Sequence, residues 1–158
     1  MKIPKIFEIK DTGEKLEPGK LAIAALFISA IVIALIVWAK NGYYDSRFSE
    51  GAFADENALL TRKIISIGLS VLPSVLMASF HVIFKITDKT SKALAFLLLV
   101  SIVLLCANGI FEAISLTNAF VTEDKLRTDL CFLLAGSHLL SAGSASNGLK
   151  ILKIQPPA

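Results

Sequence analysis

The hydrophobic residues of this chain lie in four long runs, and charged segments separate one run from the next. A helix that crosses a membrane needs about 20 mostly apolar residues, because the hydrocarbon layer is about 30 Å thick and each residue rises about 1.5 Å. The pattern therefore predicts an all-α, polytopic membrane protein with a bundle of four transmembrane helices. The predicted spans are 21–39, 64–84, 93–116 and 130–152, between a polar N-terminal arm, 1–20, and a C-terminal tail, 153–158.

Two other interpretations of these runs fail. The first run is too long for the apolar part of a secretory signal, and about twenty residues with several charges precede it. A soluble four-helix bundle would show a polar face on each helix, whereas these runs are apolar all round. The fourth run is the least hydrophobic and is rich in Gly, Ala and Ser.

The composition agrees with a membrane protein. Hydrophobic residues make up 54% of the chain and charged residues 18%, and the mean hydropathy is +0.69. Soluble domains average about 45–50% apolar and about 25% charged. These values exclude an ordinary soluble enzyme, a disordered tail and a disulfide-stapled secreted domain. The net charge of +3 comes from scattered Lys and Arg, so we expect no nucleic-acid partner.

The Lys and Arg residues are divided unequally between the two sides of the predicted bundle. Cytoplasmic loops carry the excess of these residues in membrane proteins. We therefore predict that both termini lie on the cytoplasmic side, or on the matrix side in a mitochondrion. The ten on that side are Lys2, Lys5, Lys10, Lys15, Lys20, Lys85, Lys89, Lys92, Lys150 and Lys153, against six on the other side, Lys40, Arg47, Arg62, Lys63, Lys125 and Arg127.

Polar side chains within the third span recur on one helical face. Ser101, Asn108, Glu112 and Ser115 follow one another at spacings of seven, four and three residues. The third and fourth spans are antiparallel and joined by a short loop, so Glu112 and His138 are expected at similar depth. We predict that they form a buried polar pair, in direct or water-bridged contact. A structural hydrogen bond is favoured over proton transfer, because most polar pairs in membranes only satisfy each other.

No catalytic or metal-binding set is indicated. His81 lies near the inner end of its span and His138 in the outer half of its own, a mismatch on the order of 10 Å that is too large for one haem iron. Cys106 and Cys131 lie on different helices without a C-x-x-C motif. We therefore expect no cofactor bound by this chain alone and no activity of its own.

Small residues gather in the fourth span. Small side chains allow two helices to approach closely, so this helix is expected to pack tightly against a neighbour, in this chain or in another. In the second span, Pro73 predicts a kink. The residues assigned to helix packing are Gly136, Ser137, Ser141, Gly143 and Ala145.

Taken in order along the chain, these features resemble subunit III of the heme-copper oxidases, the cytochrome c and quinol oxidase type. The first span, GKLAIAALFISA, is similar to the family's opening helix with its F-L-x-S-E motif. The second begins NALLTRKIISIGLS from Asn57, similar to N-T-x-x-L-L-x-S-S. In the third, IFEAI places Glu112 where the family keeps a buried acid, and Asp124 lies in the loop that follows. The fourth contains FLLAGSHLLSAG, similar to F-F-x-x-T-G-x-H-G-x-H, with Gly136 and His138 at matching positions.

The chain also departs from the family pattern. Ala30 replaces the acid of the first helix, and Ser141 replaces the second histidine of the last motif. The family's final helix has no counterpart, so the resemblance implies a truncated four-helix form. It extends from about Gly19 to Leu152.

The resemblance implies a non-catalytic integral subunit of a respiratory terminal oxidase. Haem and copper would belong to a partner subunit, which this chain would stabilise, and structural lipid would be bound. The expected partners are other integral membrane subunits and the lipid bilayer. The expected location is a bacterial or archaeal cytoplasmic membrane or the mitochondrial inner membrane.

Two other functions stay open on the sequence. One is a structural subunit of another multi-subunit membrane complex. The other is a small homo-oligomeric channel or transporter, in which Ser101, Asn108 and Glu112 would line the path. A stand-alone enzyme is the least expected class, because an active site needs several convergent groups.

Overall fold

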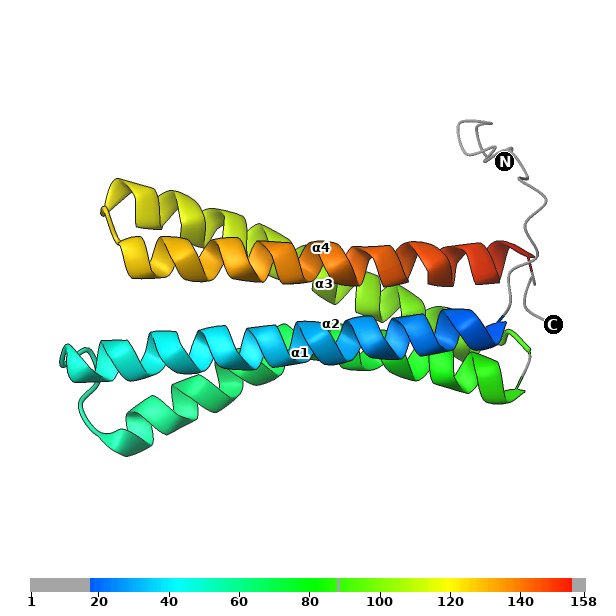
Figure 1. Ribbon diagram of the computed structural model, residues 1–158, viewed down its shortest axis with the longest axis horizontal. Coiled ribbons are helices and arrows are strands. Elements are labelled where there is room, and N and C mark those ends of the chain that lie inside the picture. The colour runs from blue at the N-terminus through cyan, green and yellow to red at the C-terminus, as the bar shows by residue number, and fades with distance from the viewer. Residues whose placement is uncertain (1–17, 88, 155–158) are drawn as a thin grey trace.

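The computed structural model describes residues 18–87 and 89–154, and these residues form four long α-helices (Figure 1). Short loops join the helices, so consecutive helices are antiparallel, and α1 begins at the end of the bundle where α4 ends (Figure 1). The all-helical prediction is confirmed for these residues. Residues 1–17 of the predicted arm and 155–158 of the predicted tail lie outside the described residues. The helices are α1 (Pro18–Ser49), α2 (Glu56–Thr87), α3 (Lys92–Val121) and α4 (Lys125–Ile154).

Each helix extends beyond the apolar run that predicted it. For example, α1 continues to Ser49, past the predicted end at Ala39, and α2 begins at Glu56 rather than at Ile64. The helices have 30 to 32 residues. They are therefore about 45–48 Å long, against about 30 Å for the hydrocarbon layer. The apolar pattern marked only part of each helix, because polar residues continue the same backbone hydrogen bonding beyond the apolar run.

Buried positions recur along each helix at spacings of three and four residues. This spacing keeps one seam of every helix toward the bundle axis, as in bundles whose helices cross at about 20°. Both α1 and α3 pack against α2 and α4, α2 also contacts α4 across the bundle, and α1 and α3 are the opposite pair. In α3 the buried residues are Leu94, Leu98, Ser101, Leu105, Glu112, Ser115 and Ala119.

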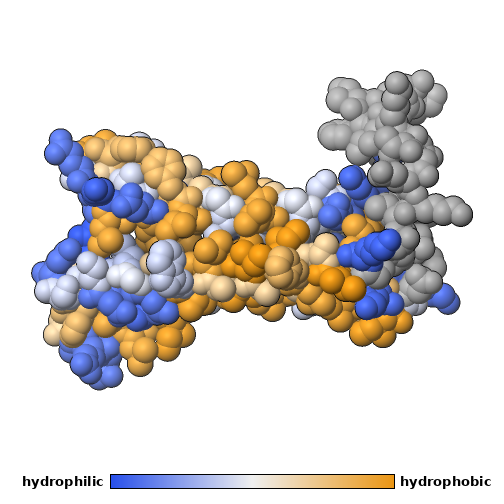
Figure 2. Space-filling model, in the orientation of Figure 1, coloured by the Kyte–Doolittle hydropathy of each residue, from blue (hydrophilic) through white to orange (hydrophobic). Residues whose placement is uncertain are grey.

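The polarity of the bundle is the reverse of that of a soluble helical protein. Exposed side chains along the middle of the bundle are largely Leu, Ile, Val and Phe, and Figure 2 shows an orange band between blue ends. Soluble bundles instead expose polar faces. The interior contains many hydroxyl groups beside its aliphatic side chains. The buried serines are Ser29, Ser70, Ser74, Ser101, Ser115, Ser137, Ser141 and Ser144.

Three helices are long and apolar enough to cross a membrane, namely α1 from Lys20, α2 and α3. Together with the apolar outer surface, this supports a membrane location. The hydropathy of α4 is lower, because its buried face carries Ser137, His138, Ser141 and Ser144. A fourth membrane span is therefore not shown by hydropathy.

Small residues allow α4 to pack closely against α2 and α3. The hydroxyl oxygens of Ser74 and Ser141 lie 2.8 Å apart and form a hydrogen bond between α2 and α4. Further along, Gly148 faces the aliphatic core. A Cβ atom at this glycine would lie 2.9 Å from Cδ1 of Leu98 and 3.1 Å from Cε1 of Phe80. A side chain at this position would therefore require Leu98 and Phe80 to shift.

The helix α2 bends near its middle, where the sequence contains Pro73 (Figure 1). Proline has no backbone N–H, so the carbonyl of residue i−4, Leu69, loses its helical hydrogen bond. The side-chain amide of Asn108 in α3 donates to this carbonyl at 3.1 Å. A polar residue of one helix thus satisfies the backbone group that proline leaves open in another.

Candidate functional site

A buried lysine lies in the half of the bundle that contains the 50–55 loop. Lys40 is only 5% exposed, and its Nζ donates to the Oγ of Ser66 at 2.7 Å and to the Ser66 carbonyl at 3.2 Å. The sequence interpretation placed Lys40 in the outer loop, which is wrong. The residue continues the buried seam of α1 one turn after Val32 and Ile36. That spacing was the sequence signal that could have located it.

Glu112 of α3 lies opposite this lysine. It is 6% exposed and lies beside the thiol of Cys131, within electrostatic reach of Lys40 and Arg127. A buried charge in lipid is costly unless an opposite charge or a hydrogen bond offsets it. Lys40 and Glu112 therefore attract each other from α1 and α3, the two helices that do not pack directly, although no direct ion pair joins them among the described residues.

His138 of α4 is 6% exposed, and both of its ring nitrogens lack a hydrogen-bond partner among the described residues. It forms no direct hydrogen bond with Glu112. Glu112 instead lies level with Cys131, and His138 is two helical turns further along α4, or about 10 Å deeper. The expected similar depth is thus wrong, because α3 continues to Val121 and α4 begins at Lys125, beyond the predicted span ends at 116 and 130. A water-mediated contact stays a prediction.

A groove between α3 and α4 joins these two side chains. Its volume is about 380 Å³, and it opens sideways on the outer surface of the bundle. Small residues at the opening, Gly109, Ala113 and Ala135, leave this space unfilled. The lining residues are Leu105, Gly109, Glu112, Ala113, Leu116, Cys131, Ala135, His138 and Leu139.

The predicted polar face of α3 points toward the other helices. Ser101 donates to the carbonyl of Leu97 at 2.8 Å, and Asn108 reaches α2 as described above. Ser115 accepts a hydrogen bond from Nε of Arg127 at 3.0 Å. Glu112 and Ser115 lie close to the groove, whereas Ser101 lies deeper in the bundle.

The predicted packing residues of α4 divide into two groups. Ser137, Ser141 and Ala145 are buried against the other helices, whereas Gly136 and Gly143 are exposed. A Cβ atom at either exposed glycine would meet nothing within 4 Å. The glycine in close contact is instead Gly148, which was not among the residues assigned to helix packing.

The two histidines are far apart along the bundle. Because α2 and α4 run parallel, the Ser74–Ser141 hydrogen bond sets their register. His81 then lies about 15 Å further than His138 from the end of the bundle that contains the 50–55 loop. This separation is too large for both to bind one metal ion. The Nδ1 of His81 lies 2.9 Å from the Met77 carbonyl within its own helix. The described residues contain no group of three or more His, Cys, Asp or Glu that could hold a metal ion.

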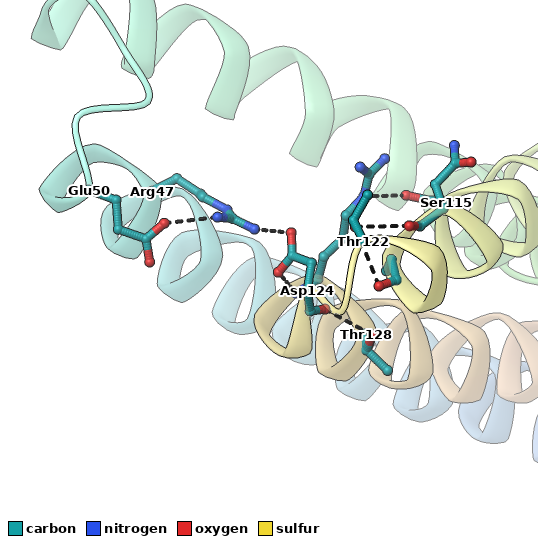
Figure 3. Close-up of polar contacts among 9 residues, drawn as sticks. Arg47, Glu50, Ser115, Thr122, Asp124 and Thr128 are labelled. Carbon is teal, nitrogen blue, oxygen red and sulfur yellow. Dashed lines mark hydrogen bonds and ion pairs between the residues drawn. The ribbon is translucent and has the colours of Figure 1, made fainter.

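Ion pairs connect the helix ends near the 122–124 turn (Figure 3). Arg47 of α1 lies between Glu50, at 2.8 Å, and Asp124, with which it also forms an ion pair. The other carboxylate oxygen of Asp124 accepts the backbone N–H of Arg127 at 3.0 Å and so caps α4. Asp124 therefore fixes the α3–α4 turn to α1.

A second groove, of about 300 Å³, lies between α1 and the first turns of α4. Trp38, Tyr43 and Leu130 contribute apolar surface, and Asn41 and Asp129 contribute polar groups. Trp and Tyr are enriched at the level of lipid headgroups. This groove thus has the composition of a membrane–water boundary.

Comparison with protein-family models, with characterised proteins and with solved structures finds no match for this chain. The fold and the site define its class directly. It is an all-helical bundle with three helices apolar enough to cross a membrane, a charged cluster inside and a lateral groove.

Proposed function

We propose that this chain is a non-catalytic integral membrane subunit that stabilises a larger membrane complex. The sequence resemblance favours a respiratory terminal oxidase, whose haem and copper would belong to the partner subunit. The observation that carries the proposal is that polar side chains turn inward and leave an apolar outer surface. Polar groups that contact each other between helices hold a scaffold together.

The proposal includes α4 as a fourth membrane span. Its sequence contains no charged residue between Cys131 and Leu149. The exposed positions in this stretch are apolar or small except for Ser146. Its low hydropathy comes from serines and His138 on the buried face. Both termini would then lie on the cytoplasmic or matrix side. Because Lys40 is buried within the bundle, it does not count among the residues of the outer loops. The excess of Lys and Arg on the inner side over the outer side is therefore larger.

The exposed glycines of α4 provide a surface for a partner helix. Gly136 and Gly143 are seven residues apart on one face, and the space above both is open. Such small residues permit the close approach of another transmembrane helix. Partner subunits would dock on this side of the bundle.

Structural lipid would bind between α1 and α4. The groove beside Trp38 and Tyr43 combines apolar walls with Asn41 and Asp129. A phospholipid there would place its acyl chains against the helices and its headgroup at the membrane surface.

A homo-oligomeric channel is less well supported. A pore shared between copies would need the polar face of α3 on the outside of the bundle. Ser101, Glu112 and Ser115 are instead buried within one chain. This observation favours the subunit over the channel.

Purification from native membranes tests the proposal. The tagged chain, extracted in a mild detergent, should co-purify with a haem- and copper-bearing subunit that mass spectrometry identifies. The Gly136→Leu/Gly143→Leu variant should lose that partner, because leucine side chains fill the docking surface. Gly68→Leu, at an equally open glycine on the outside of α2, is the matched control. Recovery of the chain alone, or as self-multiples after cross-linking, would contradict the proposal.

A further inference from the structure

The groove between α3 and α4 reaches a histidine with unused hydrogen-bonding capacity. His138 lines the groove, is 6% exposed, and has no partner on either ring nitrogen among the described residues. A neutral imidazole offers one N–H donor and one acceptor nitrogen. Buried polar groups without partners are rare, because leaving them unpaired is costly. A ligand that bonds to His138 would remove this cost.

The depth of His138 limits what such a ligand can be. His138 is thirteen residues from the start of α4 at Lys125 and close to the middle of that helix. It therefore lies about 20 Å from the end of the helix. A phosphate headgroup stays at the membrane surface and does not reach this depth. The polar head of the ligand must be compact enough to enter the hydrocarbon layer.

The charges around the groove limit the ligand further. Lys40 and Arg127 both lie within electrostatic reach of Glu112, so the carboxylate that lines the groove is already offset by cations of the chain. Adding a charged head would leave a net charge in a low-dielectric region, which is costly. The remaining lining is apolar, with Leu105, Leu116 and Leu139 among its residues. A neutral head with an apolar body matches these surroundings.

We propose that this groove binds a neutral amphiphile from the membrane, an apolar chain or ring whose hydroxyl or carbonyl head hydrogen-bonds to His138. The groove volume of about 380 Å³ holds the head and the first part of the body. The remainder extends through the opening between Gly109, Ala113 and Ala135 into the lipid. The inference depends on the membrane location of α3 and α4 but not on the identity of any partner subunit.

Photolabelling of the full chain in native membranes tests this inference. Two clickable diazirine probes represent the possible sources: hexadecanol for hydroxyl lipids and an alkylated quinone for carbonyl compounds. At least one should label peptides that contain Gly109–Leu116 or Ala135–Leu139. A diazirine phosphatidylcholine should label this groove about tenfold less, because its head cannot reach His138.

Two variants and one matched control make the result decisive. Ala135→Leu and Gly109→Leu fill the opening from α4 and α3, and each should lower labelling about tenfold. Ala142→Leu, one heptad further along the exposed face of α4 and outside the groove, should leave labelling unchanged. His138→Leu should also lower labelling, with the bundle still folded by circular dichroism. Equal labelling by phosphatidylcholine, or labelling insensitive to Ala135→Leu, overturns the inference. Neither result depends on whether a partner subunit co-purifies.

Discussion

Pro73 and Asn108 illustrate how single residues compensate for each other in this bundle. Proline removes the hydrogen bond that the Leu69 carbonyl would accept within α2, and the Asn108 amide replaces it from α3. In lipid no water is available for this carbonyl, so the cost of leaving it open is high. The sequence revealed the kink and the polar face of α3 separately. Only the folded chain connects them.

A double-mutant cycle should measure this compensation. Asn108→Leu is expected to lower the free energy of unfolding in detergent by about 1 kcal/mol. In the Pro73→Ala background the same change should cost about 0 kcal/mol, because the new N–H bonds to the Leu69 carbonyl. Equal costs in both backgrounds would show that Asn108 does not act through this carbonyl.

Two glycines of α4 should respond in opposite ways to the same substitution. Gly148→Leu must displace Leu98 and Phe80 and is expected to destabilise the bundle by about 2–3 kcal/mol. Gly143→Leu faces open space and should be neutral or slightly stabilising, because leucine favours helix over glycine. Thermal unfolding of the two purified variants checks this difference. Similar melting temperatures would contradict the close α2–α3–α4 packing.

At the scale of helices, polar contacts connect elements across the bundle. Lys40 and Glu112 bring charge from α1 and α3, the opposite pair, toward each other. Ser74 and Ser141 connect the other diagonal, α2 and α4. Asp124 connects the α3–α4 turn to the end of α1. The bundle is therefore held across both diagonals and at one end by polar groups.

Removal of one charge of Lys40 and Glu112 should lower the stability of the bundle more than removal of both charges. Glu112→Gln leaves the Lys40 ammonium uncompensated and is expected to cost about 3 kcal/mol of stability. The Lys40→Met/Glu112→Gln variant should recover much of that loss. Chemical unfolding in detergent measures both. A Glu112→Gln protein with normal stability and assembly but lost activity of its complex would instead indicate proton transfer.

The ion pair of Arg47 with Asp124 should make a smaller, salt-dependent contribution. Asp124→Asn keeps an N-cap oxygen for α4 but removes the charge. It should lower stability by about 0.5–1 kcal/mol at low salt and by less at about 1 M salt. Glu50→Gln is the control, since that side chain is half exposed and should have no measurable effect. A loss that does not change with salt would assign the effect to the cap.

At the scale of the whole molecule, the apolar band between two polar ends fixes how the bundle sits in a membrane. The 50–55 loop lies at one end, and the 89–91 segment before α3 lies at the end where α1 begins and α4 finishes (Figure 1). The proposed topology puts the first end outside and the second inside. Polar ends and an apolar middle are properties of the whole chain rather than of any one helix (Figure 2).

Cysteine labelling should reveal this topology. In intact cells, a membrane-impermeant maleimide should label the Ala52→Cys variant and not the Lys89→Cys variant. After the cells are opened, both should react, because both positions are exposed. The unmodified chain, with Cys131 buried and Cys106 on the surface of α3, is the blank. Labelling of Lys89→Cys in intact cells would reverse the orientation.

The sequence by itself determined the number of helices, their approximate centres and their membrane character. These follow from the length and spacing of apolar runs, which depend only on residues close together in the chain. It also placed Ser101, Glu112 and Ser115 on one face of α3, because that depends only on helical periodicity.

Only the tertiary structure decided how groups on different helices meet. The burial of Lys40, the contact of Asn108 with Leu69 and the depth offset between Glu112 and His138 all depend on the register of packed helices. Register is set by many contacts at once, including the close packing at Gly148 and the Ser74–Ser141 hydrogen bond. No local pattern carries that information, and the groove beside His138 is its consequence.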